Sequence, residues 1–298
     1  MEMLHSLPPY NFCGIDGKYS DFKSAKVVVL PVPYDSTASY GVGTRHGPHA
    51  IINASRNMEL YDREFDASPY EIGIHTLSEL EPSMAGPAET VERVKQVIKD
   101  ILDAGKFPFM LGGEHSLTTG AVQAVAGKFR NFSVLQLDAH ADMRDEFEST
   151  KHSHACAMRR AREITDVVQV GIRSLSADEA EYIKEKKVKN IFFMPQDTND
   201  FDAQIPKIVA ALKDNVYISF DIDALDPSEV PATGTPEPGG LRWSQAIKLL
   251  RAVAEKKKII GMDLVELAPI PGNSAPDFLA AKLAYKMVGY AFLKEMKK

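Results

Sequence analysis

The chain has 298 residues, of which 44% are apolar, and this is enough to bury a large core. Its formal charge of −6 is spread along the sequence, which disfavours a nucleic-acid or anionic-membrane partner and favours a cationic ligand. Two cysteines are too few for a disulfide framework, and neither a signal core nor an apolar run of about 18 residues occurs, so we expect a cytoplasmic protein with no membrane span.

Apolar runs and helical periodicities alternate along the chain. Because strands buried on both faces read as continuous apolar runs, we expect strands at 27–30, 72–74, 107–111, 132–137, 167–172, 191–193, 216–220 and 259–265. Apolar residues at helical spacing predict helices at 50–58, 87–105, 115–126, 177–186, 203–212, 243–254 and 276–298. A glycine-rich loop covers 40–48. This alternation predicts one α/β domain over residues 1–298, a three-layer α/β/α arrangement with a parallel sheet of roughly eight strands.

Four of the expected strands end in residues that can bind a metal ion. Gly-Gly-Glu-His-Ser follows the strand at 107–111, Asp-Ala-His-Ala-Asp follows 132–137, Asp-Ile-Asp-Ala-Leu-Asp-Pro follows 216–220, and a glutamate follows 259–265. Residues two apart in an extended chain share one face, and the carboxyl ends of parallel strands meet at one edge of a sheet. We therefore expect one cluster formed by His115, Asp138, His140, Asp142, Asp221, Asp223 and Glu266.

Each of these segments, taken alone, can be explained by local structure without a metal ion. His115 could cap a helix, and the aspartates at 221–226 could form a turn. A calcium-binding EF-hand loop is disfavoured, because it needs a glycine after its third acidic position and a distant glutamate, whereas Leu225-Asp226-Pro227 follows here. Crowded carboxylates repel one another unless a cation neutralises them. The occurrence of all four segments at one edge of the sheet therefore favours a metal site. Four aspartates with two imidazoles are too many for one zinc ion and favour two Mn²⁺ with a bridging hydroxide nucleophile.

The three motifs together resemble the signatures of the arginase/agmatinase (ureohydrolase) family, and the resemblance extends from Gly47 to Glu266. It implies an α/β/α fold with an eight-stranded parallel sheet, hydrolysis of a small cationic guanidino substrate, and a trimeric or hexameric assembly. It implies that one Mn²⁺ is bound by His115, Asp138, Asp142 and Asp221, and the other by His140, Asp138, Asp221 and Asp223.

The resemblance also implies roles in catalysis. Glu266 would pair with the guanidinium, and Asp142 would take the hydroxide proton and deliver it to the departing amine. His154 would shuttle protons at the rim, although Ala155 stands where many relatives have glycine and His152 has no assigned role. Cys156 is expected to be a buried small residue, because hydroxide chemistry needs no thiolate.

The loop after Asp142 indicates the substrate. It lacks the asparagine of arginases, and Ser174 and Ser176 stand where arginases have aspartate, which disfavours a carboxylate-bearing substrate. Arg144 and Lys151 of the same loop could nevertheless bind a carboxylate. The acidic residues Asp145 and Glu146 suit a cationic tail. Agmatine, giving putrescine and urea, is the first choice. One alternative substrate is N1-aminopropylagmatine, whose hydrolysis gives spermidine. Others are arginine, guanidinobutyrate and formiminoglutamate. A non-catalytic ureohydrolase-like binding protein is disfavoured, because every metal ligand is present.

Overall fold

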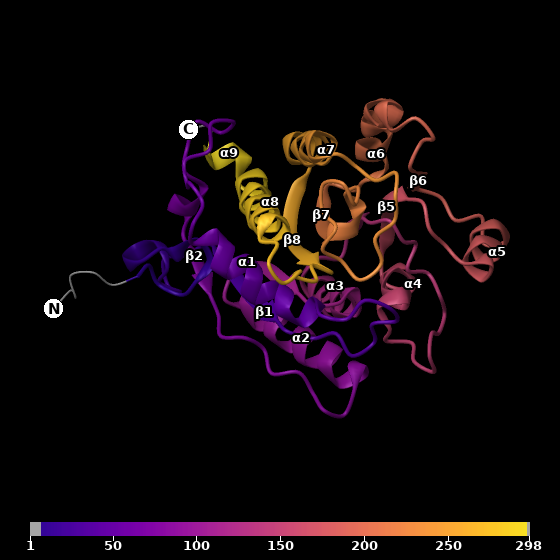
Figure 1. Ribbon diagram of the computed structural model, residues 1–298, viewed down its shortest axis with the longest axis horizontal. Coiled ribbons are helices and arrows are strands. Elements are labelled where there is room, and N and C mark those ends of the chain that lie inside the picture. The colour runs from indigo at the N-terminus through magenta and orange to yellow at the C-terminus, as the bar shows by residue number, and fades with distance from the viewer. Residues whose placement is uncertain (1–6, 297–298) are drawn as a thin grey trace.

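The computed structural model describes residues 7–296, which form a single eight-stranded parallel sheet with helices on both faces (Figure 1). The strand order is β2-β1-β3-β8-β7-β4-β5-β6. The strands are β1 (Val27–Val32), β2 (Ile74–Thr76), β3 (Phe107–Gly112), β4 (Ser133–Leu137), β5 (Asp166–Ile172), β6 (Ile191–Phe193), β7 (Asn215–Asp221) and β8 (Lys258–Val265). The predicted α/β class, the parallel sheet and the eight strands are confirmed.

Helices cover the sheet in two layers because each strand sends alternate side chains to opposite faces. In β1, Val27 and Val29 enter the core on one face, and Val28, Leu30 and Val32 enter the core on the other. The first core packs against α1 (Gly47–Ser55), α6 (Ile205–Ala211), α7 (Trp243–Lys256) and α8 (Ala275–Ala291). The second packs against α2 (Pro87–Asp103), α3 (Thr118–Lys128), α4 (Ala157–Arg162) and α5 (Ala177–Glu185).

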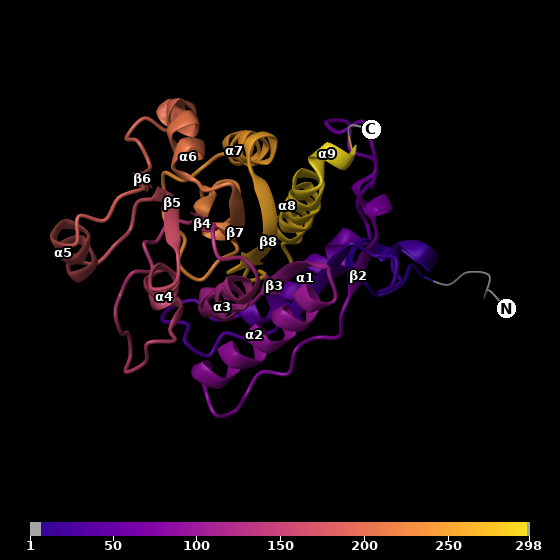
Figure 2. The ribbon, with the colours of Figure 1, turned by 180° about the vertical axis from the view of Figure 1, so that it is seen from behind.

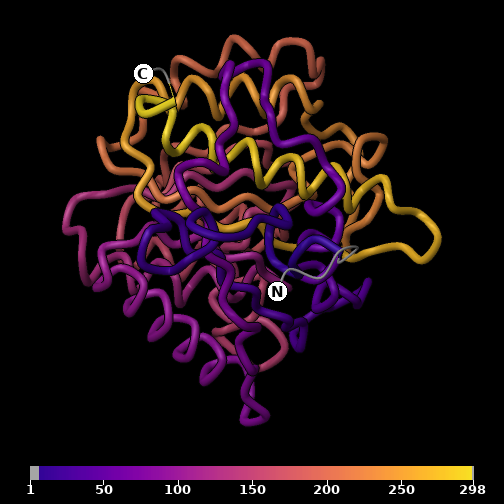
Figure 3. Tube along the Cα trace, turned by 90° about the vertical axis from the view of Figure 1, so that its left-hand side faces the viewer, coloured from indigo at the N-terminus to yellow at the C-terminus, as the bar shows by residue number. Residues whose placement is uncertain are grey.

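Contacts between distant parts of the chain close both layers. Helices α2 and α3 lie side by side on one face (Figure 2). On the other face α1 packs against α8, so that an early and a late segment of the chain meet (Figure 3). A short α9 (Leu293–Met296) follows α8. Within residues 7–296, no helix has both the length and the apolar composition needed to cross a membrane.

The central strands end level with one another. Leu264 of β8 pairs with Leu111 of β3 on one side and with Phe220 of β7 on the other, and Phe220 pairs with Leu137 of β4. The residues that follow these four positions therefore leave the sheet at the same height along one edge. This register brings the four predicted ligand segments together.

Some element boundaries differ from the sequence-based predictions. Strand β2 begins at Ile74, two residues later than expected, because Pro69–Ile72 form a 3-10 helix. The helix expected from residue 115 starts with a 3-10 turn and becomes α-helical at Thr118. The helix expected at 276–298 is divided into α8 and α9, and its last two residues lie outside the described part of the chain. Helix α4 was not predicted.

Gly113 allows two strand ends to approach closely, which gives a stability prediction. A Cβ atom at this position would lie 1.8 Å from the carbonyl oxygen of Tyr34, so something must shift. We expect Gly113→Ala to lower the free energy of unfolding by about 1–3 kcal/mol or more, the cost that an overpacked site usually carries. Gly127→Ala is the control, because its added Cβ meets nothing within 4 Å in an exposed helical position, and it should raise stability by about 0.5–1 kcal/mol. Denaturant unfolding measures both, and a Gly113→Ala protein as stable as the native one would contradict the expectation.

Candidate active site

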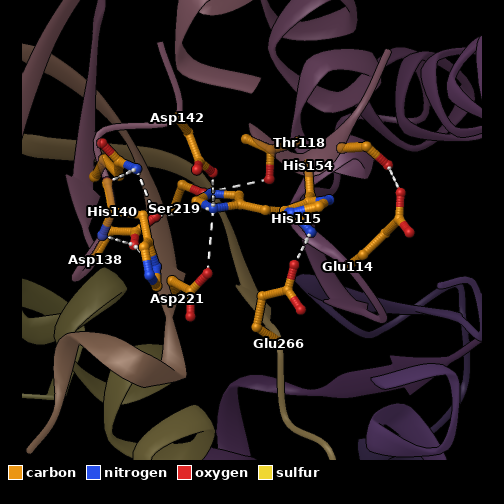
Figure 4. Close-up of polar contacts among 12 residues, drawn as sticks. Glu114, His115, Thr118, Asp138, His140, Asp142, His154, Ser219, Asp221 and Glu266 are labelled. Carbon is orange, nitrogen blue, oxygen red and sulfur yellow. Dashed lines mark hydrogen bonds and ion pairs between the residues drawn. The ribbon is translucent and has the colours of Figure 1, made fainter. Parts of the chain in front are cut away.

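Six residues from three strand ends meet at the carboxyl edge of the sheet, and all of them except Asp223 are labelled in Figure 4. His115 Nδ1 lies 3.0 Å from Asp138 Oδ2, 3.0 Å from Asp142 Oδ2 and 3.3 Å from Asp221 Oδ2. All four side chains are buried. Three carboxylate oxygens and one imidazole nitrogen thus face a common point, which is a donor set that fits a divalent cation.

A second group of donors lies beside the first. His140 Nδ1 is 2.9 Å from Asp223 Oδ2 and 3.5 Å from Asp138 Oδ1. Asp138 belongs to both groups and turns a different oxygen to each. The two groups are therefore arranged as in a binuclear centre, with Asp138 between the two ion positions.

The surroundings of His115 test whether a metal ion fits. Its Nδ1 is buried and has no hydrogen-bond partner of its own. Its other nitrogen, Nε2, lies 2.9 Å from Ser219 Oγ, and that hydroxyl donates to Asp263 Oδ1 at 2.7 Å. Because the hydroxyl proton goes to Asp263, Ser219 accepts from Nε2–H. This arrangement turns Nδ1 toward the carboxylates, so that its lone pair would be free to bind a metal ion once Nδ1 loses its proton.

The charges of the site are strongly coupled. Burial, reinforced by Asp223 and Asp138, holds the pKa of Asp221 well above its usual range, and burial together with Asp138 raises the pKa of Asp142 to about 7. Burial acts to lower the pKa of His140, but Asp223 and Asp138 outweigh it and raise the pKa to about 12. With protein atoms alone, the carboxylates are thus balanced by protons on carboxyls and imidazoles. Divalent ions would replace those protons, because ligands bind metal in their deprotonated form.

Glu266 lies directly beside this cluster. Its Oε1 accepts a hydrogen bond of 2.6 Å from the backbone N–H of His115, and its backbone has a φ of 66°, in the left-handed region. Burial and then the neighbouring Glu114 hold the pKa of its carboxyl well above the usual value. A partly buried carboxylate in a left-handed backbone conformation at a strand end is typical of a functional position.

A pocket of about 260 Å³ opens above the donors. Its lining includes His140, Asp142, Asp221, Asp223 and Glu266 from the cluster, together with His154. Side chains that the sequence did not single out complete the lining, among them Ser39, Tyr40, Phe147, Glu179 and Thr235. Glu179 had a local signal, since Ser176-x-x-Glu179 is a capping box, but its approach to the pocket depends on tertiary packing.

The two loop acids expected to bind the substrate tail do not line this pocket. Asp145 and Glu146 line a neighbouring cavity with Arg159 and Tyr182. Asp145 accepts from Arg160 Nη2 at 2.7 Å, and this hydrogen bond lowers the pKa of its carboxyl.

Cys156 is buried, as expected, and burial raises the pKa of its thiol to about 11. A thiol with this pKa stays protonated at neutral pH and is a poor nucleophile.

Paired carboxylate and imidazole groups at the carboxyl edge of a parallel sheet define the class of metal-dependent hydrolases with a binuclear site. The arginase family profile matches residues 25–289, and the chain belongs to this family as a ureohydrolase. It is 40% identical to the N(1)-aminopropylagmatine ureohydrolase of Synechocystis (91% of this chain, 90% of the relative) and 42% identical to one from Thermus thermophilus (91% and 92%). It is 33% identical to the agmatinase of Pyrococcus horikoshii (90% and 93%). The crystal structure of agmatine ureohydrolase of Thermoplasma volcanium superposes with a TM-score of 0.85 at 32% identity, covering 98% of this chain and 97% of that one.

The shared position of Asp138 gives a prediction about metal stoichiometry. Asp138→Asn weakens both donor groups, so the purified protein should retain neither ion after loading and desalting. Asp223→Asn touches only the group around His140 and should retain one ion. Elemental analysis of protein loaded with Mn²⁺ measures both. Two retained ions in Asp138→Asn would contradict the bridging position of this residue.

Proposed function

We propose that the enzyme hydrolyses N1-aminopropylagmatine to spermidine and urea with two Mn²⁺ ions per subunit. The similarity at 40–42% identity over nine-tenths of the chain to two N(1)-aminopropylagmatine ureohydrolases carries this choice. Agmatine, the first choice from the sequence, becomes the second candidate. It is favoured by the 33% identity to an agmatinase and by the likeness to a solved agmatine ureohydrolase.

Manganese suits the donors. Four aspartates and two imidazoles are hard or intermediate ligands, and the two described cysteines lie outside both donor groups. We assign His115, Asp138, Asp142 and Asp221 to one ion, and His140, Asp138, Asp221 and Asp223 to the other. When bound, the two ions activate a water molecule for attack on the guanidinium carbon, which is a poor electrophile in water.

Glu266 recognises the guanidinium in this proposal. One of its oxygens is occupied by the N–H of His115, so the carboxylate is fixed in orientation while it lines the pocket. A charge-assisted pair with the planar substrate cation would set the face of the carbon that the attacking water meets.

Asp142 and His154 handle protons. Both line the pocket, Asp142 on the side of the donors. Asp142 receives the proton of the attacking water and passes it to the departing amine, which must leave protonated. His154 exchanges protons between the pocket and solvent.

The substrate tail meets acidic and aromatic groups. Glu179 is 5% exposed and lines both this pocket and the adjoining cavity. Its Oε1 accepts from the backbone N–H of Met143 and its Oε2 from Ser176, so its negative charge is held at the pocket and would attract a cationic tail. We rank it ahead of Asp145 and Glu146, whose acidic side chains lie in the adjoining cavity and would act at longer range. The tail of N1-aminopropylagmatine has two amines, so it would be attracted more strongly to this acidic lining than the tail of agmatine, which has one.

A urea-release assay with the manganese-loaded enzyme tests the substrate. We expect kcat/KM to be highest for N1-aminopropylagmatine, lower for agmatine, and lowest for arginine and guanidinobutyrate, whose carboxylates meet the acidic lining. Glu179→Gln should raise KM more for N1-aminopropylagmatine than for agmatine. A preference for agmatine would establish the second candidate, and a preference for arginine would overturn both.

The role of Glu266 has a separate test. Removal of the charge in Glu266→Gln should cost about 1.5–3 kcal/mol of transition-state binding, roughly 10- to 150-fold in kcat/KM, while metal content stays at the native level. Glu92→Gln is the control, since the Glu92 side chain on α2 is 60% exposed and lies outside the pocket lining. If Glu266→Gln lost metal, the carboxylate would have a structural role at the donors.

A further inference from the structure

A buried hydroxyl and a buried carboxylate hold His154 from a side that the metal donors do not use. Thr37 comes from the loop after β1, Glu114 from the turn after β3, and His154 from the 3-10 turn before α4. Thr37 is 8% exposed and Glu114 is fully buried. Three segments that are distant in sequence therefore meet at one imidazole ring.

The hydrogen bonds of Thr37 can be counted completely. Glu114 Oε2 accepts from the backbone N–H of Thr37 at 2.7 Å, and Glu114 Oε1 lies 2.6 Å from Thr37 Oγ1. A carboxylate can only accept, so the single hydroxyl proton of Thr37 is directed to Glu114. The two lone pairs of Thr37 Oγ1 remain. One accepts the backbone N–H of His154 at 3.0 Å, and the other faces His154 Nδ1 at 3.2 Å.

We propose that Thr37 and Glu114 are positioning residues that fix the neutral His154 ring with its proton on Nδ1, leaving Nε2 as an unprotonated acceptor for substrate or water. Each hydrogen bond at Thr37 Oγ1 must join one donor to one acceptor. Thr37 Oγ1 has no proton left to give to Nδ1, so the contact is a hydrogen bond only when Nδ1 carries the hydrogen. Among the described residues, no hydrogen bond engages Nε2.

Two further contacts bear on the ring. The edge of Phe147 meets it at a centroid distance of 6.0 Å and an interplanar angle of 85°, which restricts rotation. Burial lowers the pKa of His154 to about 4, so the ring carries one proton at neutral pH and its tautomer matters. Ser153 Oγ lies 3.4 Å from Nδ1 and could instead donate to it, which would place the ring proton on Nε2. The shorter contact of Thr37 favours the first arrangement, and the two arrangements are experimentally distinct.

The test reads the tautomer directly by NMR. Protein labelled with ¹⁵N-histidine and loaded with diamagnetic Mg²⁺ is measured at about pH 9, well above the ordinary pKa of a carboxyl or an imidazole group. The His154 signals are assigned by their loss in His154→Asn. We expect a protonated Nδ1 and an unprotonated Nε2 in the native protein and in Ser153→Ala. Thr37→Val should shift the proton to Nε2, and Thr37→Ser should keep it on Nδ1. A protonated Nε2 in the native protein, or an unchanged tautomer in Thr37→Val, would overturn the proposal.

A kinetic measurement complements this readout and rests on the proposed role of His154. Thr37→Val should lower kcat about tenfold, a part of the ~10²- to 10⁴-fold that a positioned acid or base contributes, with little change in KM or metal content. Thr37→Ser should restore kcat. Because the tautomer is measured without turnover, a changed tautomer with unchanged kcat would remove the proton role of His154 while leaving its positioning by Thr37 intact.

Discussion

The burial of four aspartates within a few ångströms of one another is the constraint on which this structure depends. Asp138, Asp142, Asp221 and Asp223 are each at most 6% exposed, and their mutual repulsion would oppose folding without a compensating charge. The two imidazoles supply part of that charge as cations in the absence of metal, and divalent ions supply it when they displace the protons. Folding, metal affinity and the catalytic chemistry are thus linked through the same four carboxylates.

The sheet provides the rigidity that such a cluster needs. The register across β3, β8, β7 and β4 ends four strands at one height, and the backbone then turns sharply to bring its side chains inward. Asp142 and Glu266 adopt positive φ values of 50° and 66°, which are uncommon for residues with a Cβ atom. The surrounding strand pairings hold these conformations in place, so the strain is tolerated at the two carboxylates to which we assign a metal ion and the substrate guanidinium.

Two sets of hydrogen bonds orient two histidines of the site. Ser219 and Asp263 fix the ring of His115 so that Nδ1 faces the donors, and Thr37 with Glu114 holds the ring of His154 at the pocket. Each uses a hydroxyl between an imidazole and a buried carboxylate. In our proposal the same chemistry serves a metal ligand in one case and a proton carrier in the other, because a hydroxyl that donates its own proton to a carboxylate can only accept from a ring.

Sequence by itself determined the sheet, the cluster and the chemistry, because alternating ligands such as Asp138, His140 and Asp142 follow buried strands whose carboxyl ends must share an edge. The family motifs also identified Glu266 and His154 as residues of the site. Only the tertiary structure decided the pocket lining. Glu179 lines the pocket, whereas Asp145 and Glu146, which lie close to Asp142 in the sequence, do not, because the direction of a loop side chain depends on packing between segments. The same holds for Thr37, which lies 117 residues from His154 and meets it through contacts that no local pattern encodes.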